Sequence, residues 1–314
     1  MDKAKNLRIA VIIPCLNEEA TIERVLRGFR EQLPEADLYV IDNESADKTA
    51  QIARHNGALV LRETRRGKGF ATRRAFREVE ADVYLLVDGD DTYPPEDGRR
   101  MLEPLLEGRA DVVVGTRFGS QRSEFRSVNR IGNQILLRIL NALFGVNITD
   151  LLSGYRAMTR EFVKQVPVLS AGFELETELS ILAFRRGFRT VEIPVRLRSR
   201  PAGSHSKISV VRDGFRILSA IFTLLRDYRP LRFFGGAGIA CIGLGALPGL
   251  FVTYEFIRRG TVRIPTAVLA TGMVLSGLLL ILVGVVLTTL NRRFRELDYR
   301  LTLLSDEFRQ RRGV

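Results

Sequence analysis

Cysteine and histidine are scarce in this chain, which holds two of each among its 314 residues. The two cysteines, Cys15 and Cys241, are distant in sequence and sit in apolar surroundings, which argues against a disulfide framework or a cysteine metal cluster. Two histidines cannot build a histidine-rich metal site. A metal bound by this chain would therefore take oxygen ligands, which favours Mg or Mn as the cofactor.

A secretory signal is also missing from the start of the sequence. Residues 1–8 are polar and basic, and the apolar run at 9–13 is too short for the core of a signal peptide. We therefore expect the N-terminal part to stay in the cytoplasm.

Positive charge, in contrast, is abundant, because 48 Lys and Arg stand against 36 Asp and Glu to give a net charge of +12. Such an excess suggests an anionic partner, which could be nucleic acid, a phosphorylated substrate or anionic lipid. The arginines are dispersed and have no aromatic stacking platform, so we do not expect nucleic-acid binding. The alternative is a soluble basic protein that binds no anionic partner.

Short apolar runs alternate with stretches of helical spacing from residue 8 to about 117. The apolar runs are RIAVIIP (8–14), DLYVID (37–42), ALVLRE (58–63), VYLLVD (83–88) and DVVVGT (111–116). The helical stretches are 18–32, 45–55, 67–80 and 95–107, with Ser45 expected to cap the second. This alternation predicts an α/β fold with a mostly parallel sheet flanked by helices, whose ligands bind beyond the carboxyl ends of the strands.

Polar clusters follow three of the expected strands, at residues 14–17, 42–45 and 88–91. In the last cluster, Asp88 and Asp90 are separated by one small residue and could approach a divalent cation already held by a diphosphate. Three neighbouring carboxylates repel one another, so a cation or surrounding water must share their charge. A solvated Asp-Gly-Asp turn is the alternative interpretation.

The C-terminal third contains two long uncharged stretches. Residues 233–254 and 264–291 hold no charge, and both stretches exceed the ~20 residues that cross a bilayer. We predict transmembrane helices at about 232–257 and 264–290. Two amphipathic helices, at about 129–144 and 209–226, would either pack on the sheet or lie in the membrane interface.

These elements predict three parts. A cytoplasmic domain spans 1–228, a two-helix membrane region spans 229–291, and a charged cytoplasmic tail helix spans 292–314. An apolar stripe on the tail helix would either pair with another subunit, so that we expect a homo-oligomer, or lie on the membrane. We expect a multi-pass protein of the cell membrane with both ends in the cytoplasm.

Several motifs together resemble a known family. VIIPCLNEEATIERVL, VIDNESADKTAQIA, RRGKGFATRRAF, LLVDGDDTYPPED and VVVGTRF occur in the order seen in family-2 glycosyltransferases of the GT-A fold. DLLSGYRAMTRE, GFELETEL and RPAGSHSKI extend the resemblance, over about residues 8–230, toward the polyprenyl-phosphate branch. That branch includes dolichyl-phosphate-mannose synthases and dolichyl- and undecaprenyl-phosphate glucosyltransferases. The resemblance implies a Rossmann-like GT-A domain that moves a sugar from a nucleotide-diphosphate sugar to polyprenyl phosphate.

The resemblance also implies a role for particular residues. The expected nucleotide-sugar contacts are Pro14, Leu16, Asn17, Glu18, Asp42, Asn43, Lys68, Gly69, Asp88 and Gly89. The expected lipid-phosphate contacts are Arg117, Arg130, Arg200, Ser206 and Lys207. The expected metal ligands are Asp88 and Asp90, and the expected catalytic residues are Asp90, Asp150 and Arg117.

Three positions depart from the family pattern, with Asn43 in place of a second aspartate, Thr92 in place of a glutamine and His205 in place of an acid. The resemblance favours UDP-glucose or UDP-N-acetylglucosamine as donor, with GDP-mannose as the alternative. A lipid phosphate is already an anion at neutral pH, so the reaction needs no strong general base. Two alternative functions belong to other classes of protein. One is a nucleotidyltransferase, against which the missing glycine-rich phosphate loop argues, and the other is an inactive membrane scaffold.

Overall fold

The structure of the chain is a computed structural model. It describes residues 7–116, 137–138, 141, 149–150, 153–172, 174–198, 219, 222–223, 225–227 and 229–311. The chain divides into two compact units, Met1–Ile221 and Phe222–Val314. The helices predicted at 129–144 and 209–226 lie largely outside the described residues.

Within the described part of the first unit, seven strands form one sheet. They are β1 (Ile9–Cys15), β2 (Ala36–Asp42), β3 (Leu59–Arg62), β4 (Val83–Leu86), β5 (Val112–Thr116), β6 (Arg156–Thr159) and β7 (Thr190–Pro194). The strand order is β3-β2-β1-β4-β6-β5-β7. Strands β3, β2, β1 and β4 pair in parallel, as do β5 and β7, whereas β6 runs antiparallel to both β4 and β5. The predicted mostly parallel sheet is therefore confirmed.

The two strands that the apolar pattern did not indicate are β6 and β7. Strand β6 carries a fully buried arginine, Arg156, in place of an apolar residue. Strand β7 carries a glutamate, Glu192, between Val191 and Ile193, which interrupts its apolar run. Neither strand has the continuous apolar run that identifies the first five.

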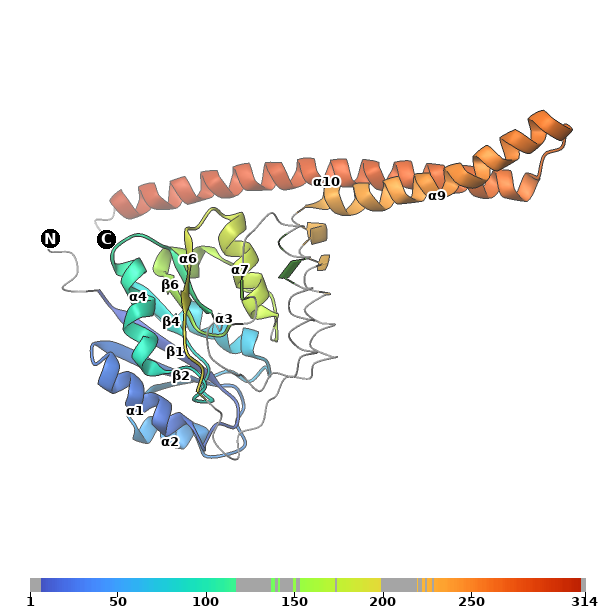
Figure 1. The fold of residues 1–314 in the computed structure, drawn as a ribbon. Helices are drawn as coiled ribbons and strands as arrows, with labels where there is room; N and C mark the ends of the chain where they lie inside the picture. The colour runs from blue at the N-terminus through green and yellow to red at the C-terminus, as the bar shows by residue number, and fades with distance from the viewer. Residues whose placement is uncertain are drawn as a thin grey trace. The chain divides into compact units, whose positions relative to one another are not determined.

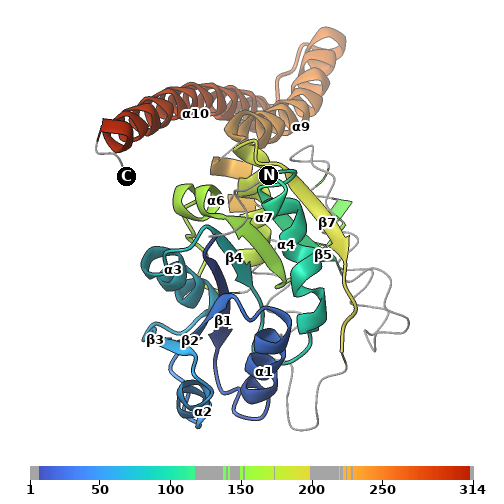
Figure 2. The ribbon, with the colours of Figure 1, turned by 90° about the vertical axis from the view of Figure 1, so that its left-hand side faces the viewer.

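Helices cover both faces of the sheet. They are α1 (Ile22–Gln32), α2 (Thr49–His55), α3 (Lys68–Glu78), α4 (Gly98–Leu106), α6 (Arg160–Gln165) and α7 (Leu175–Arg185). Figure 2 shows α3 and α6 on one side of β1 and β4, and α1 and α4 on the other side.

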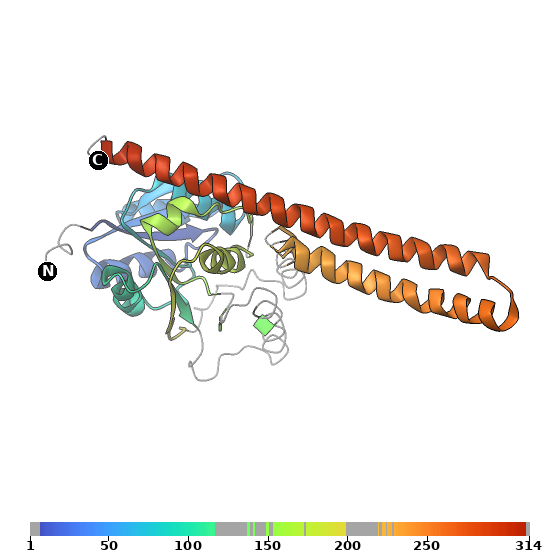
Figure 3. The ribbon, with the colours of Figure 1, turned by 90° about the horizontal axis from the view of Figure 1, so that it is seen from above.

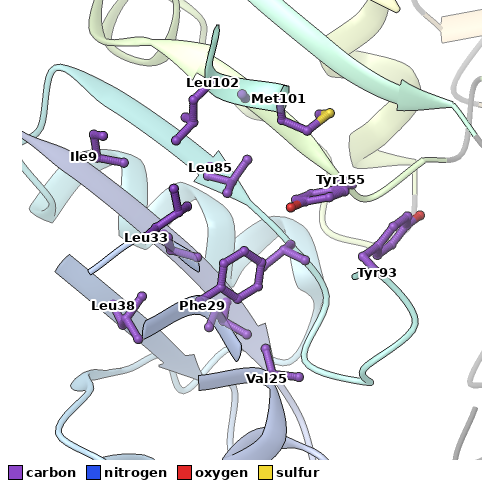
Figure 4. Close-up of a cluster of buried hydrophobic side chains, with 14 of the residues drawn as sticks. Ile9, Val25, Phe29, Leu33, Leu38, Leu85, Tyr93, Met101, Leu102 and Tyr155 are labelled. Carbon is purple, nitrogen blue, oxygen red and sulfur yellow. The ribbon is translucent and has the colours of Figure 1, made fainter. Parts of the chain in front are cut away.

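Helices α1 and α4 close the main hydrophobic core against the sheet (Figure 4). Phe29 of α1 packs edge-on against Tyr155, with ring centroids 6.5 Å apart, and Tyr93 lies 5.3 Å from the same ring. Tyr93 follows the aspartate cluster at residues 88–91, so the core fixes the chain that leaves this cluster. Burial of these rings stabilises the loop as well as the sheet.

The start of α2 differs from the prediction. The helix begins at Thr49 and has Lys48 at its N-cap, so Ser45 does not cap it. Instead, Ser45 Oγ accepts a hydrogen bond from the backbone N–H of Asn17 at 3.0 Å. A longer loop between β2 and α2 therefore carries polar side chains to the edge of the sheet.

The second unit is built on two long helices, α9 (Pro230–Arg259) and α10 (Ile264–Arg311), which run side by side and are joined by a short turn (Figures 1 and 3). By length and composition both are able to cross a membrane, over 230–259 and 264–294. Helix α10 continues without a break into the predicted tail at 292–314.

Glycines line the contact between α9 and α10. A Cβ atom on Gly238 would lie 2.5 Å from the carbonyl oxygen of Gly277, and one on Gly277 would lie 2.6 Å from that of Gly238. The two backbones approach so closely that no side chain fits between them at this point, as in many helix pairs within lipid.

Candidate active site

The carboxyl ends of β1, β2 and β4 meet at one edge of the sheet. Cys15 is paired with Asp42, and Ile12 is paired with Leu86, which places the loops after these strands next to each other. The polar clusters at 14–17, 42–45 and 88–91 therefore converge as predicted.

Hydrogen bonds join the loop after β1 to the loop after β2. Asn17 adopts a positive φ of 54°, and its Oδ1 accepts the N–H of Ala46 at 2.8 Å. The N–H of Glu18 donates to Thr49 Oγ1 at 2.8 Å. Pro14 belongs to β1, and Leu16 follows that strand. These contacts build one continuous rim from two strands.

Asp42 and Asn43 stand at the end of β2 and are both buried. Asp42 Oδ1 accepts the N–H of Ser45 at 3.2 Å. Asn43 Nδ2 donates to the carbonyl oxygens of Glu63 at 3.1 Å and Arg65 at 2.7 Å, and its Oδ1 accepts the N–H of Gly67 at 2.6 Å. Asn43 thus holds the connection between β3 and α3, and two of its bonds need a donor that an aspartate lacks.

Lys68, the first residue of α3, forms ion pairs with two carboxylates from other elements. Its Nζ contacts Asp88 Oδ1, at the end of β4, and lies 2.6 Å from Glu176 Oε1, in the first turn of α7. The neighbouring carboxylates raise the pKa of Lys68 despite the opposing effect of its burial, so the ammonium stays charged. The side chain of Asp88 is 30% exposed, whereas that of Glu176 is 3% exposed.

The glycines on both sides of Lys68 pack against the loop at residues 169–172. A Cβ atom on Gly69 would lie 2.0 Å from the carbonyl oxygen of Ser170, and the Gly69 N–H donates to the carbonyl of Ala171 at 3.0 Å. The carboxylate of Glu178 holds this loop by accepting the N–H groups of Leu169 and Ser170 at 2.9–3.1 Å.

Each aspartate of the 88–91 cluster has a different set of contacts. Asp88 is paired with Lys68, as described above. Asp90 Oδ1 accepts the Thr92 hydroxyl at 2.6 Å and the Thr92 N–H at 3.2 Å. Asp91 adopts a positive φ of 59° and pairs with Arg24 Nε at 3.1 Å and Arg198 at 3.4 Å. Arginine partners therefore share the charge of Asp91.

The backbone at Gly89 is closely packed against Cys15 and Thr21. A Cβ atom there would lie 2.7 Å from Cys15 Sγ, and the Gly89 carbonyl accepts the Thr21 hydroxyl at 2.7 Å. These contacts hold the backbone between Asp88 and Asp90 in place.

Asp88 and Asp90 are candidate ligands for a divalent cation that takes most of its other ligands from phosphate and water. Within the described residues, no three or more His, Cys, Asp and Glu side chains gather into a metal cluster. Mg²⁺ and related ions commonly use one or two carboxylates and complete their shell with phosphate oxygens and water. Asp90 and the partly exposed Asp88 can supply that number of ligands.

Asp150 is 1% exposed, and it lies near the buried guanidinium of Arg156. Burial lowers the pKa of Arg156, and the carboxylates of Glu176 and Asp150 act in the opposite direction. Arg156 also donates to the carbonyl oxygen of Ser153 at 3.0 Å and to Ser180 Oγ at 2.9 Å. A catalytic role for Asp150 stays a prediction.

The predicted lipid-phosphate contacts lie outside the described residues, and their roles stay predictions. They are Arg117, Arg130, Arg200, Ser206 and Lys207.

The sequence did not assign a role to Glu176 or to Arg198. The alternating glutamates of the motif GFELETEL indicated either the acidic first turn of a helix or a contact of one glutamate with the sugar, without singling out Glu176. Only the folded chain shows that Glu174 and Glu178 hold the loop at 169–172, whereas Glu176 pairs with Lys68.

Comparison with known proteins identifies the class of protein. The sequence profile of Glycosyl transferase family 2 matches residues 10–166. Glycosyltransferase AglJ of Haloferax volcanii is 35% identical over 279 residues, which span 88% of this chain and 91% of that protein. The dolichyl-phosphate hexose transferase of the same organism is 32% identical over 222 residues, which span 70% of this chain and 95% of that protein.

A further relative and a solved structure agree with this assignment. The undecaprenyl-phosphate mannosyltransferase of Micrococcus luteus is 29% identical over 217 residues, covering 65% of this chain and 88% of that protein. Glucosyl-3-phosphoglycerate synthase from Mycobacterium tuberculosis, in complex with Mn²⁺, UDP and glucosyl-3-phosphoglycerate, superposes with a TM-score of 0.58 at 25% identity. The superposition covers 70% of this chain and 81% of the synthase.

The chain belongs to glycosyl transferase family 2, and its first unit has the GT-A fold. The predicted fold and enzyme class are thereby confirmed.

Proposed function

We propose that this protein is a membrane-anchored hexosyltransferase that moves a sugar from a nucleotide-diphosphate sugar to polyprenyl phosphate. The observation that carries the proposal is the convergence of Asp42, Asp88 and Asp90 at the carboxyl edge of the sheet, in a chain that also holds two helices able to cross a membrane. The relatives named for dolichyl phosphate and undecaprenyl phosphate support this choice of acceptor.

The donor would lie across the edge of the sheet. The rim formed by residues 14–18 and 42–45 would take the nucleoside, and the carboxylates of Asp88 and Asp90 would face the sugar diphosphate. A divalent cation bound there would neutralise the departing diphosphate. A synthase of similar fold was solved with UDP and Mn²⁺, which supports a nucleotide donor and a divalent cation.

The reaction we propose is a displacement at the anomeric carbon. An oxygen of the lipid phosphate attacks that carbon, the bond to the nucleotide diphosphate breaks, and the configuration inverts. The lipid phosphate is already ionised at neutral pH, so no side chain has to remove a proton. The protein instead has to hold two anions together, which is the task predicted for Arg117, Arg130, Arg200 and Lys207.

A UDP-sugar, glucose or N-acetylglucosamine, is our preferred donor, because the solved relative binds UDP. GDP-mannose is the second candidate, since a mannosyltransferase is among the relatives. We also propose that the catalytic unit faces the cytoplasm, where nucleotide sugars are made.

Transfer of radiolabelled sugar into the organic phase tests the proposal. Purified protein in detergent is given UDP-glucose, UDP-N-acetylglucosamine or GDP-mannose, together with undecaprenyl or dolichyl phosphate and Mg²⁺ or Mn²⁺. We expect one donor to label a polyprenyl-phosphate sugar, and the label to disappear when the lipid is omitted. Tight binding of a nucleotide sugar without transfer to either lipid would instead favour an inactive scaffold.

A further inference from the structure

Three charged side chains lead from the interior of the first unit toward the proposed donor site. They are Glu176, Lys68 and Asp88, in that order. Lys68 belongs to α3, Asp88 follows β4, and Glu176 lies in α7, so three separate elements meet at one ammonium. Exposure increases in the same order, from 3% for the side chain of Glu176 to 11% for Lys68 and 30% for Asp88. Asp88 is therefore the most exposed of the three charged groups.

Burial of the charged Glu176 side chain at this position is unfavourable for the free energy of folding. Its Oε1 contacts Lys68, but within the described residues its Oε2 meets no hydrogen-bond partner. A buried carboxylate oxygen without a partner lowers the stability of a fold. Two buried cations, the ammonium of Lys68 and the guanidinium of Arg156, offset the charge of Glu176, and of the two only Lys68 also pairs with Asp88 within the described residues.

The surroundings leave Lys68 little freedom apart from this contact. A Cβ atom on Gly154 would lie 2.9 Å from Lys68 Nζ and 2.5 Å from Asp88 Oδ2. The backbone at residue 154 is therefore packed closely against the ion pair. Gly67 and Gly69 pack against the carbonyl oxygens of the loop at 169–172. The backbone of Lys68 is therefore fixed, and the position of its Nζ depends on the two carboxylates.

We propose that Glu176 is a positioning residue, which holds the ammonium of Lys68 against Asp88 and thereby fixes the orientation in which Asp88 meets the donor. The proposal rests on the proposed function of the site, because it assumes that a nucleotide-diphosphate sugar binds at Asp88. In this arrangement Glu176 acts on the donor through Lys68 alone.

The substitution Glu176→Gln tests the role, because it keeps the size of the side chain and removes its charge. We expect the KM for the donor and the Kd for UDP to rise about tenfold, the scale of one charge-assisted hydrogen bond, while kcat changes less than threefold. Glu176→Asp keeps the charge but shortens the side chain, so it should recover part of the affinity. An unchanged donor KM and UDP Kd in Glu176→Gln would overturn the proposal.

Asp111→Asn is the matched control. Asp111 pairs with Arg189 at 2.8 Å and accepts the Arg189 N–H at 2.8 Å. The two residues directly precede the parallel strands β5 and β7, so the pair lies at the amino ends of these strands and away from the carboxyl edge. This variant also loses a charged pair, and we expect a lower melting temperature with an unchanged KM for the donor. If Asp111→Asn raised the KM as much as Glu176→Gln does, the effect would be general destabilisation and the proposal would be wrong.

A double-mutant cycle with Lys68→Met separates an indirect role from a direct one. If Glu176 acts only through Lys68, Glu176→Gln should change the UDP Kd little once Lys68 is replaced. Additive losses would show that Glu176 contacts the ligand directly, which contradicts the proposal. UDP binding is measured without any acceptor, so a wild-type protein that binds UDP but transfers nothing to lipid would disprove the proposed function and still allow this test.

Discussion

Asn43 lies at the carboxyl edge of the sheet, beside the proposed donor site, and its buried side chain holds the neighbouring backbone. It is 3% exposed and is bonded to three backbone groups of the segment at 63–67. The family pattern places an aspartate at this position, so the sequence alone suggests a lost carboxylate. The contacts show an amide that donates two hydrogen bonds, which explains the departure in physical terms.

Asn43→Asp should destabilise the first unit by about 2–3 kcal/mol, because a carboxylate would face two carbonyl oxygens and lose two donated bonds. Chemical unfolding in detergent measures the change. Asn56→Asp is a matched control, since Asn56 Nδ2 donates a single bond to the carbonyl of Ile52 at 3.0 Å, and we expect about 1 kcal/mol or less there. Equal losses in the two variants would contradict a special role for Asn43.

The three aspartates at 88–91 look equivalent in the sequence, but their contacts separate them. Asp91 is held by Arg24 and Arg198 and has its charge shared already. We therefore expect Asp91→Asn to lower the melting temperature by a few degrees, about 1 kcal/mol, and to leave Mn²⁺-dependent UDP binding nearly unchanged. Isothermal titration of UDP in Mn²⁺ measures this, and a loss of binding as large as that of Asp90→Asn would show that Asp91 is a metal ligand.

At the scale of elements, the first five strands were predictable because each lies in a short apolar run, which in β1, β4 and β5 is buried almost throughout. Strand β6 was not, because it buries a charged residue, Arg156, which is hydrogen-bonded to Ser180 on the distant helix α7. The start of α2 was also misjudged, since Ser45 bonds to the neighbouring loop rather than to its own helix. The local sequence pattern predicts that a helix or strand is present. Contacts between elements determine where it begins and which polar residues it can bury.

The connection between β3 and α3 depends on the close approach of Gly67 to the loop at 169–172. Gly67 has a φ of 142°, and a Cβ atom there would lie 2.1 Å from the carbonyl oxygen of Ala171. Gly67→Ala should therefore destabilise the protein by about 2–4 kcal/mol and weaken UDP binding, because it combines backbone strain with a clash.

Gly108→Ala is the control for backbone strain alone in the preceding prediction. Gly108 has a φ of 67°, and no described atom lies within 4 Å of the place where its Cβ would stand. We expect a loss of about 1 kcal/mol in chemical unfolding and no effect on UDP binding. A Gly67→Ala protein as stable as Gly108→Ala would show that the loop simply moves aside.

The contact between α9 and α10 makes a separate prediction. Gly277→Leu should push the helices apart by roughly 2 Å, toward the usual ~8–10 Å between packed helices. Spin labels at two exposed positions, Ile239 and Leu282, would report this distance. Gly272→Leu in the same helix is the control, because no described atom lies within 4 Å of a Cβ there, and an equal shift in both variants would contradict the packing.

At the scale of the whole molecule, the sequence predicted the α/β unit, the glycosyltransferase family and two helices able to cross a membrane. The convergence of three polar clusters could be predicted because parallel strands share one carboxyl edge. The pairing of Lys68 with Glu176 could not, because it joins residues 108 positions apart and no periodicity encodes such a contact.

A donor site that depends on a divalent cation is tested most directly by titrating UDP into the full-length protein in detergent, with Mn²⁺ or with EDTA. We predict that the wild-type protein binds UDP in Mn²⁺ at least tenfold more tightly than in EDTA, and that Asp90→Asn abolishes this difference. Equal binding of UDP by the wild-type protein with and without the cation, or an undiminished effect of Mn²⁺ in Asp90→Asn, would contradict a cation-assisted site at this edge of the sheet.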